Sequence, residues 1–447
     1  MTSVRELASV RDLAVAAKAA SRVLAPMDEV ARNRALEAMA AAVEAAAAEL
    51  FAANAEDLRA AETLSGEDAL SPSTLSRLKL TEAKLREMVE QIRSVAALAD
   101  PLGRVLDATE LDDADPVASA APTGLRLQKI SVPLGVLAVI FEARPDAVTQ
   151  IAALALKSGN AVLLKPGREV ERTAAALVAV LREAVAGAGL PRELMALVLG
   201  REQAAEMLAM HDAIDMVIPR GSKKLVEYVQ ATTRIPVLGH AEGICHIYVD
   251  CAADEQLALR VIEDAKLDYP AACNAVETVL VHREMAAAFV PKLASRLAAK
   301  GVKLHGDAAV RALVREAQPV GEWSHEYGEP EIALGVVDSL DAAIAHIHKH
   351  GASHTESILT EDAAAAERFL REVDAAGVYH NASTRFADGF RYGFGAEVGI
   401  STSKFHARGP VGLDGLTTYK YVLRGRGHVA GDYRGADGRS FTHRKES

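Results

Sequence analysis

The chain opens with a long stretch whose residues favour helix. From about residue 5 to residue 100 Ala, Leu and Glu dominate, and ARNRALEAMAAAVEAAAAELFAANAEDLRAAE consists largely of strong helix formers. This composition predicts a helical N-terminal region. After residue 116 the pattern changes, because LRLQKISVPLGVLAVIFEARP predicts two strands that meet near Pro133 and Gly135, where Pro and Gly signal a turn.

The rest of the chain alternates short apolar runs with helical stretches. DAVTQIAALALKSGN has the pattern of a helix closed by Gly and Asn, and AVLLKP that of a short buried strand. Strands that alternate with helices predict a parallel sheet with helices on both faces. We therefore expect an α/β fold with two α/β domains. Further strands are expected at LMALVLG, IDMVIP, ICHIYVD, ETVLVH, EIALGVV, ESILT and GVYHNAS.

Composition and charge narrow the class of protein. Half of the 447 residues are hydrophobic, yet no apolar run approaches the ~18 residues that span a bilayer. Glu6 and Asp12 interrupt the opening stretch, which lacks the apolar segment of a secretory signal and the acid-poor composition of a mitochondrial presequence. We therefore expect a cytoplasmic protein with no membrane partner. A net charge of -11 also disfavours nucleic acid as the main partner.

The cysteines and histidines give no metal pattern. Three cysteines in a chain of this length form no disulfide framework, and Cys245 and Cys251 have poor spacing for zinc. His346 and His350 lie one helical turn apart but lack an evident third ligand, so we expect no metal site. Cys273, in YPAACNAVETVLVH, precedes a predicted strand. Its own surroundings leave two interpretations open, a small buried residue or a nucleophile.

Two predicted strand ends carry groups that suit a dinucleotide. Ligands of open parallel sheets bind at the carboxyl ends of strands. AVLLKPGRE leaves Lys165 and Arg168 at one such end. IPRGSKKLVEYV leaves Gly221 and Ser222 at another, opening a helix whose free N–H groups suit a phosphate. An ordinary polar turn between strand and helix is the alternative at each place.

The motifs together resemble one family. VPLGVLAVIFEARPDAV, ALKSGNAVLLKPG, IPRGS, GICHIYVD, NAVETVLV and the run from NASTRF through GAEVGIS to HARGPVGLDGLTTY are similar, in this order, to the γ-glutamyl phosphate reductases, a branch of the aldehyde dehydrogenase superfamily. The resemblance extends from about residue 10 to the C-terminus. The long GFRYGFGAEVGISTSK run and the extended tail are similar to the fungal form of the family.

The resemblance implies a fold and three parts of the chain. The fold is aldehyde-dehydrogenase-like, with a Rossmann-type cofactor domain, an α/β catalytic domain and a β-strand oligomerisation arm. The parts are an NADPH-binding domain over residues 1–240 with a strand arm at about 124–142, a catalytic domain over 241–395, and a return segment, oligomerisation strand and tail over 396–447. A homo-oligomer is expected.

The resemblance also implies site residues. Cys273 corresponds to the catalytic thiol, Lys165 to the lysine on the adenosine ribose, and Gly221 with Ser222 to the turn on the pyrophosphate. Glu326 corresponds to the glutamate on the nicotinamide ribose. The implied activity is reduction of L-glutamyl 5-phosphate to L-glutamate 5-semialdehyde in proline biosynthesis, through a cysteine thioester and with release of phosphate.

Two departures from the wider superfamily refine this expectation. Hydrolytic relatives carry a water-activating glutamate about 34 residues before the cysteine, a place that falls here on Leu238 or Gly239. Its absence suits a thioester that phosphate resolves, and disfavours the alternative of a hydrolytic aldehyde dehydrogenase. Relatives that prefer NAD carry a glutamate three residues after the lysine, where this chain has Arg168. A cation there favours NADPH/NADP+ because it attracts the ribose 2′-phosphate.

Substrate recognition needs partners for a carboxylate, an ammonium and a phosphate. Glu142 or Glu397 are candidates for the ammonium, and His406 and Arg408 for the phosphate or a subunit contact. The candidates for the glutamyl head are Arg144, Asn381, Ser383, Thr384 and Arg385. The sequence has no amino-acid kinase domain, so we expect transient contact with a separate glutamate 5-kinase. A non-catalytic scaffold of the same fold is the remaining alternative.

Overall fold

The structure is a computed structural model that describes residues 9–64, 70–112, 124–239, 242–436 and 438–446. It divides the chain into two compact units. Unit 1 comprises Met1–Ile218, Thr232–Val237 and Gly412–Ser447, and unit 2 comprises Pro219–Ala231 and Leu238–Val411. The division departs from the expected one in two places, because residues 219–231 belong to unit 2 and the return to unit 1 comes at residue 412 instead of 396. None of the described helices is both long and apolar enough to cross a membrane.

Unit 1 begins with the expected helical region. Three of the helix starts are explained locally: Ser9, Asp28 and Thr81 accept a hydrogen bond from a main-chain N–H of the first turn and so cap α1, α2 and α5. The helices of this unit are α1 (Val10–Leu24), α2 (Glu29–Ala45), α3 (Ala47–Glu62), α4 (Pro72–Leu78), α5 (Glu82–Ala97), α6 (Asp146–Lys157), α7 (Glu171–Gly187) and α8 (Gly200–Ala209).

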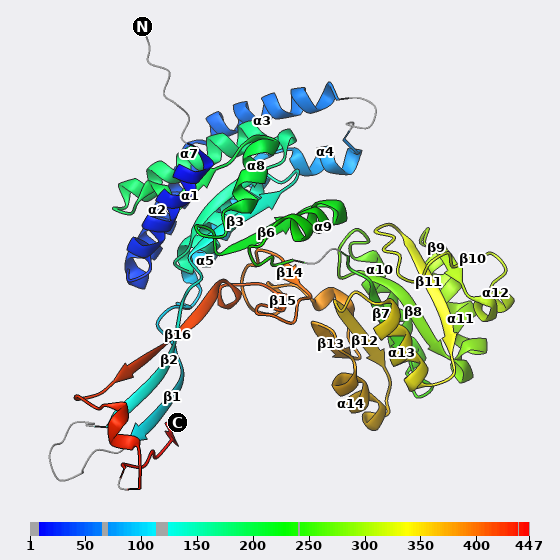
Figure 1. Cartoon of the computed structure of the whole chain (residues 1–447). Coiled ribbons are helices and arrows are strands. Elements are labelled where there is room, and N and C mark those ends of the chain that lie inside the picture. Colours follow the sequence, from blue (N-terminus) through cyan, green and yellow to red (C-terminus); the bar gives the residue numbers. More distant parts are fainter. Residues whose placement is uncertain (1–8, 65–69, 113–123, 240–241, 437, 447) are drawn as a thin grey trace. The chain divides into compact units, whose positions relative to one another are not determined.

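The central sheet of unit 1 has the order β5-β4-β3-β6. Its strands are β3 (Val136–Phe141), β4 (Ala161–Pro166), β5 (Met195–Leu197) and β6 (Met216–Arg220). Strand β4 runs parallel to both β3 and β5. All six residues of β3, VLAVIF, are buried, which is the pattern of a strand covered on both faces. Figure 1 shows helices packed around this sheet.

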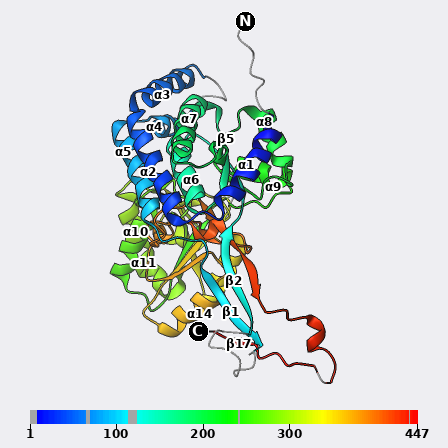
Figure 2. The same cartoon turned by 90° about the vertical axis from the view of Figure 1, so that its left-hand side faces the viewer.

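A second sheet of unit 1 is antiparallel, with the order β16-β2-β1-β17. It contains β1 (Val105–Asp112), β2 (Leu125–Pro133), β16 (Thr417–Arg424) and β17 (Arg444–Lys445). Figure 2 shows β1 and β2 side by side in a long ribbon. The expected arm at 124–142 is therefore wrong in its second half. Strand β2 lies in this sheet, whereas β3, apolar throughout, lies in the parallel one.

Unit 2 is built on a seven-stranded sheet with the order β10-β9-β11-β8-β7-β12-β13. Every neighbouring pair in it is parallel. The strands are β7 (Cys245–Val249), β8 (Val276–His282), β9 (Lys303–Gly306), β10 (Gln318–Pro319), β11 (Glu331–Val337), β12 (Thr355–Leu359) and β13 (Gly377–His380). A short pair, β14 (Ile400–Ser401) and β15 (Gly409–Pro410), is antiparallel. The helices are α9 (Lys223–Thr232), α10 (Glu255–Leu267), α11 (Arg283–Ala298), α12 (Ala308–Leu313), α13 (Leu340–His350) and α14 (Ala363–Glu372).

Alternate residues of the central strands of unit 2 enter two apolar cores. Ile247 and Val279 pack with Phe289 of α11 in one cluster. Tyr248 and Leu280, the next residue in each strand, pack in the other cluster, with side chains of α13 and α14. Because successive side chains of a strand point to opposite faces, the two clusters lie on the two sides of the sheet. The parallel sheets and the helices around them confirm the α/β class expected from the sequence.

Candidate active site

Cys273 lies in a tight turn between α10 and β8. The main-chain N–H of Ala272 donates to the carbonyl of Tyr269 at 3.1 Å, and that of Ala275 to the carbonyl of Ala272 at 2.9 Å. Among the residues that the structure describes, the Cys273 N–H has no hydrogen-bond acceptor. The turn therefore holds the thiol at the amino end of β8 and leaves one main-chain donor beside it, as an oxyanion site needs.

Residues that precede and begin β7 pack against the cysteine turn. The thiol of Cys245 donates to the carbonyl oxygen of Cys273 at 3.4 Å. Gly243 packs so closely that a Cβ added there would lie 2.0 Å from the same oxygen and 2.6 Å from the Cys273 Cα. Only glycine fits at position 243 without displacing the cysteine. The position of the thiol therefore depends on this contact between two separate loops.

The electrostatic surroundings of Cys273 disfavour the thiolate. Burial, followed by the charges of Glu326 and Glu397, raises the pKa of the Cys273 thiol to about 12, although Arg220 and Arg385 act in the opposite direction. The thiol is therefore protonated at neutral pH in the absence of ligands. Attack on a substrate then requires a group that removes the proton.

Glu326 lies on the loop before β11. Burial raises the pKa of its carboxyl group, although a hydrogen bond from the main-chain N–H of Gly243 favours the ionised form. Gly243 thus contacts both Glu326 and Cys273. The structure places Glu326 next to the cysteine turn in unit 2, so the sequence-derived candidates Cys273 and Glu326 share one site.

A buried ion pair anchors the loop that carries Glu326. The Lys266 ammonium lies 2.9 Å from the Glu277 carboxylate, and both side chains are almost wholly buried. The two Glu277 oxygens also accept from the main-chain N–H groups of Tyr327 and Gly328, at 3.3 and 3.4 Å. Burial raises the pKa of Glu277 to about 7. Sequence reasoning missed this pair, since nothing in a lone Glu on an apolar strand indicates its partner.

The loop at 381–391 borders the cysteine turn. Asn274 donates from its side chain to the carbonyl of Ala387 at 2.9 Å. Arg385, whose side chain is 12% exposed, pairs with Asp268 at 3.0 Å. Arg391 pairs with the same carboxylate at 3.0 Å. Asp268 and Asn274 lie on either side of Cys273 in the sequence, so these contacts join the arginine-bearing loop to the cysteine turn.

The other candidates on this loop have side chains that are buried or form hydrogen bonds that stabilise the loop. The side-chain amide of Asn381 accepts from the Thr360 N–H and donates to the Thr360 carbonyl, both at 3.0 Å. Ser383 is buried and caps a short helical turn by accepting from the Arg385 N–H at 3.3 Å. Thr384 is fully buried, and its hydroxyl has no partner among the described residues. Of the four, Arg385 is the one whose charge acts on the Cys273 thiol.

The other polar candidates of unit 2 also have defined partners. Glu242, near the place of the missing water-activating glutamate, forms an ion pair with Lys223. Arg408 pairs with Asp374 at 2.9 Å. Glu397 accepts from the main-chain N–H of Gly389 at 2.8 Å.

The carboxyl ends of the unit 1 strands carry the other candidates. Lys165 lies in β4, where it donates to the Pro166 carbonyl at 2.7 Å, and burial lowers the pKa of its ammonium group. Arg168 follows the strand and is exposed, with no acceptor or ion-pair partner among the described residues. The Glu169 carboxylate accepts from the Ala143 N–H at 2.5 Å and so ties this turn to the one after β3. Lys165 and Arg168 thus lie at the edge where parallel sheets bind ligands.

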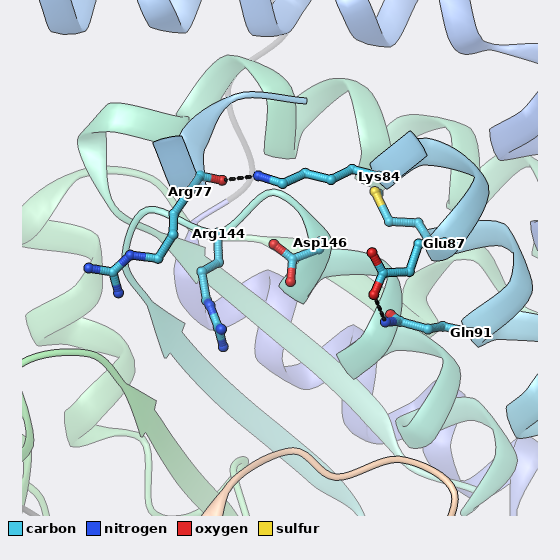
Figure 3. Close-up of a pocket in the computed structure, with 7 residues that line it drawn as sticks. Arg77, Lys84, Glu87, Gln91, Arg144 and Asp146 are labelled. Atoms are coloured by element: carbon cyan, nitrogen blue, oxygen red, sulfur yellow. Dashed lines mark hydrogen bonds between the residues drawn. The ribbon is translucent and has the colours of Figure 1, made fainter. Parts of the chain in front are cut away.

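Arg144 lines a cavity of about 130 Å³ in unit 1. Figure 3 shows Arg77, Lys84 and Arg144 around this cavity together with the carboxylates of Glu87 and Asp146. The Lys84 ammonium group caps the C-terminal end of α4, since it donates to the carbonyl of Lys79 at 2.8 Å and to two other carbonyls. Cations and carboxylates in one small cavity match the two charges of an α-amino acid.

Gly221 and Ser222 lie where the sequence predicted, between β6 and α9. Both are exposed, and the Ser222 carbonyl accepts from the N–H groups of Leu225 and Val226 at 3.0 and 3.1 Å, which starts the helix. These two residues and Glu326 belong to unit 2, whereas Lys165 and Arg168 belong to unit 1. The predicted cofactor residues thus form two groups, each described within its own unit.

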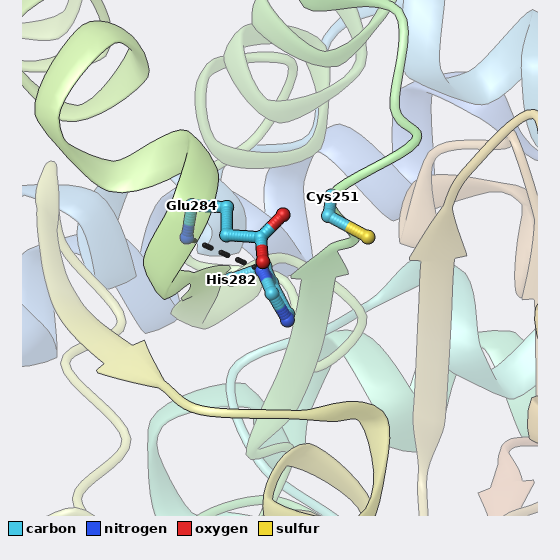
Figure 4. Close-up of side chains that lie close together, drawn as sticks. All are labelled: Cys251, His282 and Glu284. Atoms are coloured by element: carbon cyan, nitrogen blue, oxygen red, sulfur yellow. Dashed lines mark hydrogen bonds between the residues drawn. The ribbon is translucent and has the colours of Figure 1, made fainter.

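One further cluster lies at the other end of the central strands of unit 2. The ligand atoms of Cys251, His282 and Glu284 all lie within 4.8 Å of one another, just past the ends of β7 and β8 (Figure 4). Cys251 and Glu284 are exposed, and the Nδ1 atom of His282 accepts from the Glu284 N–H at 3.2 Å as a helix cap. Since Cys273 precedes β8 and His282 ends it, this cluster is separate from Cys273.

Comparison with known proteins identifies the family. The model of the aldehyde dehydrogenase family matches residues 4–319. The γ-glutamyl phosphate reductase of Cyanothece is 51% identical over 437 residues, with 98% of each chain covered. The crystal structure of the γ-glutamyl phosphate reductase of Thermotoga maritima is 38% identical, with a TM-score of 0.89 over 94% of this chain and 100% of that one.

A third relative is fungal. The structure of the γ-glutamyl phosphate reductase of Saccharomyces cerevisiae is 34% identical, with a TM-score of 0.52 over 96% of this chain and 100% of that one. Both other relatives are more similar to this chain than the yeast enzyme is, so the whole-chain comparison does not favour the fungal form over the others. The chain belongs to the aldehyde dehydrogenase family and, within it, to the γ-glutamyl phosphate reductases.

Proposed function

We propose that the chain catalyses the NADPH-dependent reduction of L-glutamyl 5-phosphate to L-glutamate 5-semialdehyde, with Cys273 as the nucleophile. The observation that carries this proposal is the cysteine turn. It holds the thiol beside a main-chain N–H that has no acceptor among the described residues, and the charges of two carboxylates and two guanidinium groups act on that thiol. Once deprotonated, the sulfur attacks the acyl carbon, phosphate leaves and a thioester remains. The Cys273 N–H donates to the oxyanion that forms in this step.

The cofactor assignment rests on residues at two strand ends. Bound NADPH supplies the hydride that converts the thioester to the aldehyde. Lys165 suits the adenosine ribose because it lies near the carboxyl end of β4, where ligands of parallel sheets bind, and its ammonium group can donate to hydroxyl groups. Arg168 is exposed and makes no ion pair with any described residue, so it is available for a 2′-phosphate. Gly221 and Ser222 precede α9 and offer N–H groups to the pyrophosphate, and Glu326 accepts from the nicotinamide ribose.

The substrate assignment uses charge complementarity. Arg385, held by Asp268 beside the cysteine turn, and Arg144, at the mixed-charge cavity of unit 1, are our candidates for the anionic groups of glutamyl phosphate. We assign Asn381, Ser383 and Thr384 to shaping the loop that presents Arg385, because their side chains are bonded within the loop or buried.

The assembly and partner assignments are also proposals. Strand β16 is at an edge of the antiparallel sheet, and Tyr419, Tyr421 and Leu423 on it are 48%, 61% and 56% exposed. Exposed apolar side chains on an unpaired strand edge suit a contact with a second copy of the chain. The acyl phosphate comes from a separate glutamate 5-kinase, either free or by direct transfer, since acyl phosphates are labile.

The test measures NADP+ reduction with glutamate semialdehyde, with and without phosphate. We expect phosphate-dependent turnover in the parent chain and in Cys251→Ser, a control at an exposed cysteine, and its loss in Cys273→Ser. Phosphate-independent turnover that yields free glutamate would support the hydrolytic alternative, and NADPH binding without turnover would support the scaffold. Parent-level turnover in Cys273→Ser would refute the mechanism.

A second measurement tests the cofactor. Arg168→Glu places a carboxylate where we expect the 2′-phosphate. We expect the KM for NADP+ to rise at least about tenfold relative to that for NAD+, because the new charge repels the phosphate. An unchanged ratio of the two KM values would remove Arg168 from the cofactor site.

A further inference from the structure

The proposed reaction requires a group that carries the proton of the Cys273 thiol. Acylation of Cys273 requires its proton to leave, and departure of phosphate as a stable dianion requires a proton to arrive. The water-activating glutamate of hydrolytic relatives is absent, and Glu242 near its place is paired with Lys223. A different group has to accept the proton.

Two carboxylates and two guanidinium groups act on the thiol: Glu326, Glu397, Arg220 and Arg385. The arginines cannot accept a proton. Each carboxylate accepts a main-chain N–H, Glu397 from Gly389 and Glu326 from Gly243. Glu326 is attached more directly to the turn, because Gly243 contacts both its carboxylate and the Cys273 main chain. Glu326 is therefore the better-placed acceptor.

Resting on the proposed function, we propose that Glu326 takes the proton from the Cys273 thiol and returns it to the departing phosphate. The S–H bond breaks as the S–C bond forms, and the proton moves to a Glu326 oxygen. The C–O bond to phosphate then breaks, and Glu326 protonates the phosphate. When the aldehyde later leaves, Cys273 is released as a thiolate and takes one proton from solvent, which is the proton that the overall reduction consumes.

Two structural features fit Glu326 to this role. Its carboxyl group is half-buried, and burial raises its pKa, so it holds a proton more readily than an exposed glutamate does. Its loop is fixed from inside the protein, since the buried carboxylate of Glu277 binds the N–H groups of the next two residues and is itself paired with Lys266. Glu277 is a positioning residue that limits how far Glu326 can move.

The experiment separates this role from contact with the nicotinamide ribose. Butyryl phosphate, an acyl phosphate without the amino group that would cyclise, is mixed with the enzyme in the absence of any cofactor. Release of one equivalent of phosphate then reports acylation of Cys273 alone. Glu326→Gln is compared with Glu329→Gln, an exposed glutamate three residues further on.

We expect Glu326→Gln to slow the phosphate burst by about 100-fold or more, the usual range for loss of a general acid–base group. We expect the Glu329→Gln burst to match that of the parent. In the parent the burst rate should rise with pH as Glu326 ionises and then level off. In Glu326→Gln it should rise tenfold per pH unit into the alkaline range, because only hydroxide ion then ionises the thiol.

The outcomes are distinguishable. A Glu326→Gln burst at the parent rate with a slow hydride step would overturn the inference and leave Glu326 as a cofactor residue. Absence of a burst in the parent would refute the thioester mechanism itself. If Glu326→Gln fails to fold, Glu326→Asp keeps the carboxylate. The inference then requires Glu326→Asp to show the levelling pH profile of the parent, and a profile without levelling would overturn it.

Discussion

A methyl group added at Gly243 should disable the nucleophile while leaving the fold largely intact. In Gly243→Ala the new Cβ would lie 2.0 Å from the carbonyl oxygen of Cys273 and 2.6 Å from its Cα. The cysteine turn must move by roughly 1.4 Å to restore an ordinary contact of 3.4 Å. Both neighbours are main-chain atoms, so no flexible side chain can absorb the displacement.

The expected loss is large because catalysis is sensitive to position. A displacement of this size costs on the order of 10²-fold in rate, or about 2.7 kcal/mol of transition-state stabilisation. The strain itself should lower the free energy of unfolding by about 1–3 kcal/mol. The same change would also disturb the hydrogen bond from the Gly243 N–H to the Glu326 carboxylate, and this disturbance adds to the effect on the thiol.

The assay is phosphate-dependent NADP+ reduction, with thermal unfolding as the check on folding. Gly239→Ala is the matched control, because its added Cβ would lie 3.5 Å from the nearest atom, in Pro219, which is an ordinary contact. We expect parent-like kcat for Gly239→Ala and a kcat lower by about 100-fold for Gly243→Ala. Parent-like kcat in a folded Gly243→Ala protein would refute the argument that this contact positions the thiol.

Three other predictions concern the same unit. In a Cys251→Ser, Glu326→Gln background, the rate of Cys273 alkylation by iodoacetamide should rise tenfold per unit from pH 7 to about pH 10 without levelling, since burial raises the thiol pKa far above this range. A plateau near pH 8 would contradict it. Lys266→Met leaves the buried Glu277 carboxylate without its partner and should lower the free energy of unfolding at pH 8 by about 3–5 kcal/mol. The loss should be smaller at pH 5, because burial raises the pKa of Glu277 even with Lys266 present, and the carboxyl group is then neutral; equal losses at pH 5 and pH 8 in urea unfolding would count against this. Thr384→Val replaces a buried hydroxyl, which has no partner among the described residues, with a methyl group. It should leave the KM for glutamate semialdehyde unchanged and the free energy of unfolding equal to that of the parent or up to about 1 kcal/mol higher; a raised KM would return Thr384 to the substrate site.

The helices and strands could be predicted because their signals are local. Helix caps such as Ser9 and Asp28 act within one turn, and apolar runs such as VLAVIF reflect burial of that strand alone. The order of strands and helices then led to an α/β fold. The sheet to which each strand belongs was harder to predict from the sequence. Strands β2 and β3 are neighbours in sequence yet lie in different sheets, a choice made by partners such as β16, more than 280 residues away.

The candidate site likewise has features that the sequence predicts and features that only folding creates. From the residues alone Cys273 was either buried or reactive, and the order of family motifs made it the expected nucleophile. What surrounds the thiol depends on contacts between segments far apart in the chain: Gly243 behind the turn, the Glu326 loop held by Glu277, and Arg385 held by Asp268. A lone glycine or glutamate carries no sign of these partners. The sequence by itself therefore identified the candidate nucleophile. The tertiary structure decided how its proton is held, because the pKa of a thiol depends on burial and on charges brought near it by folding.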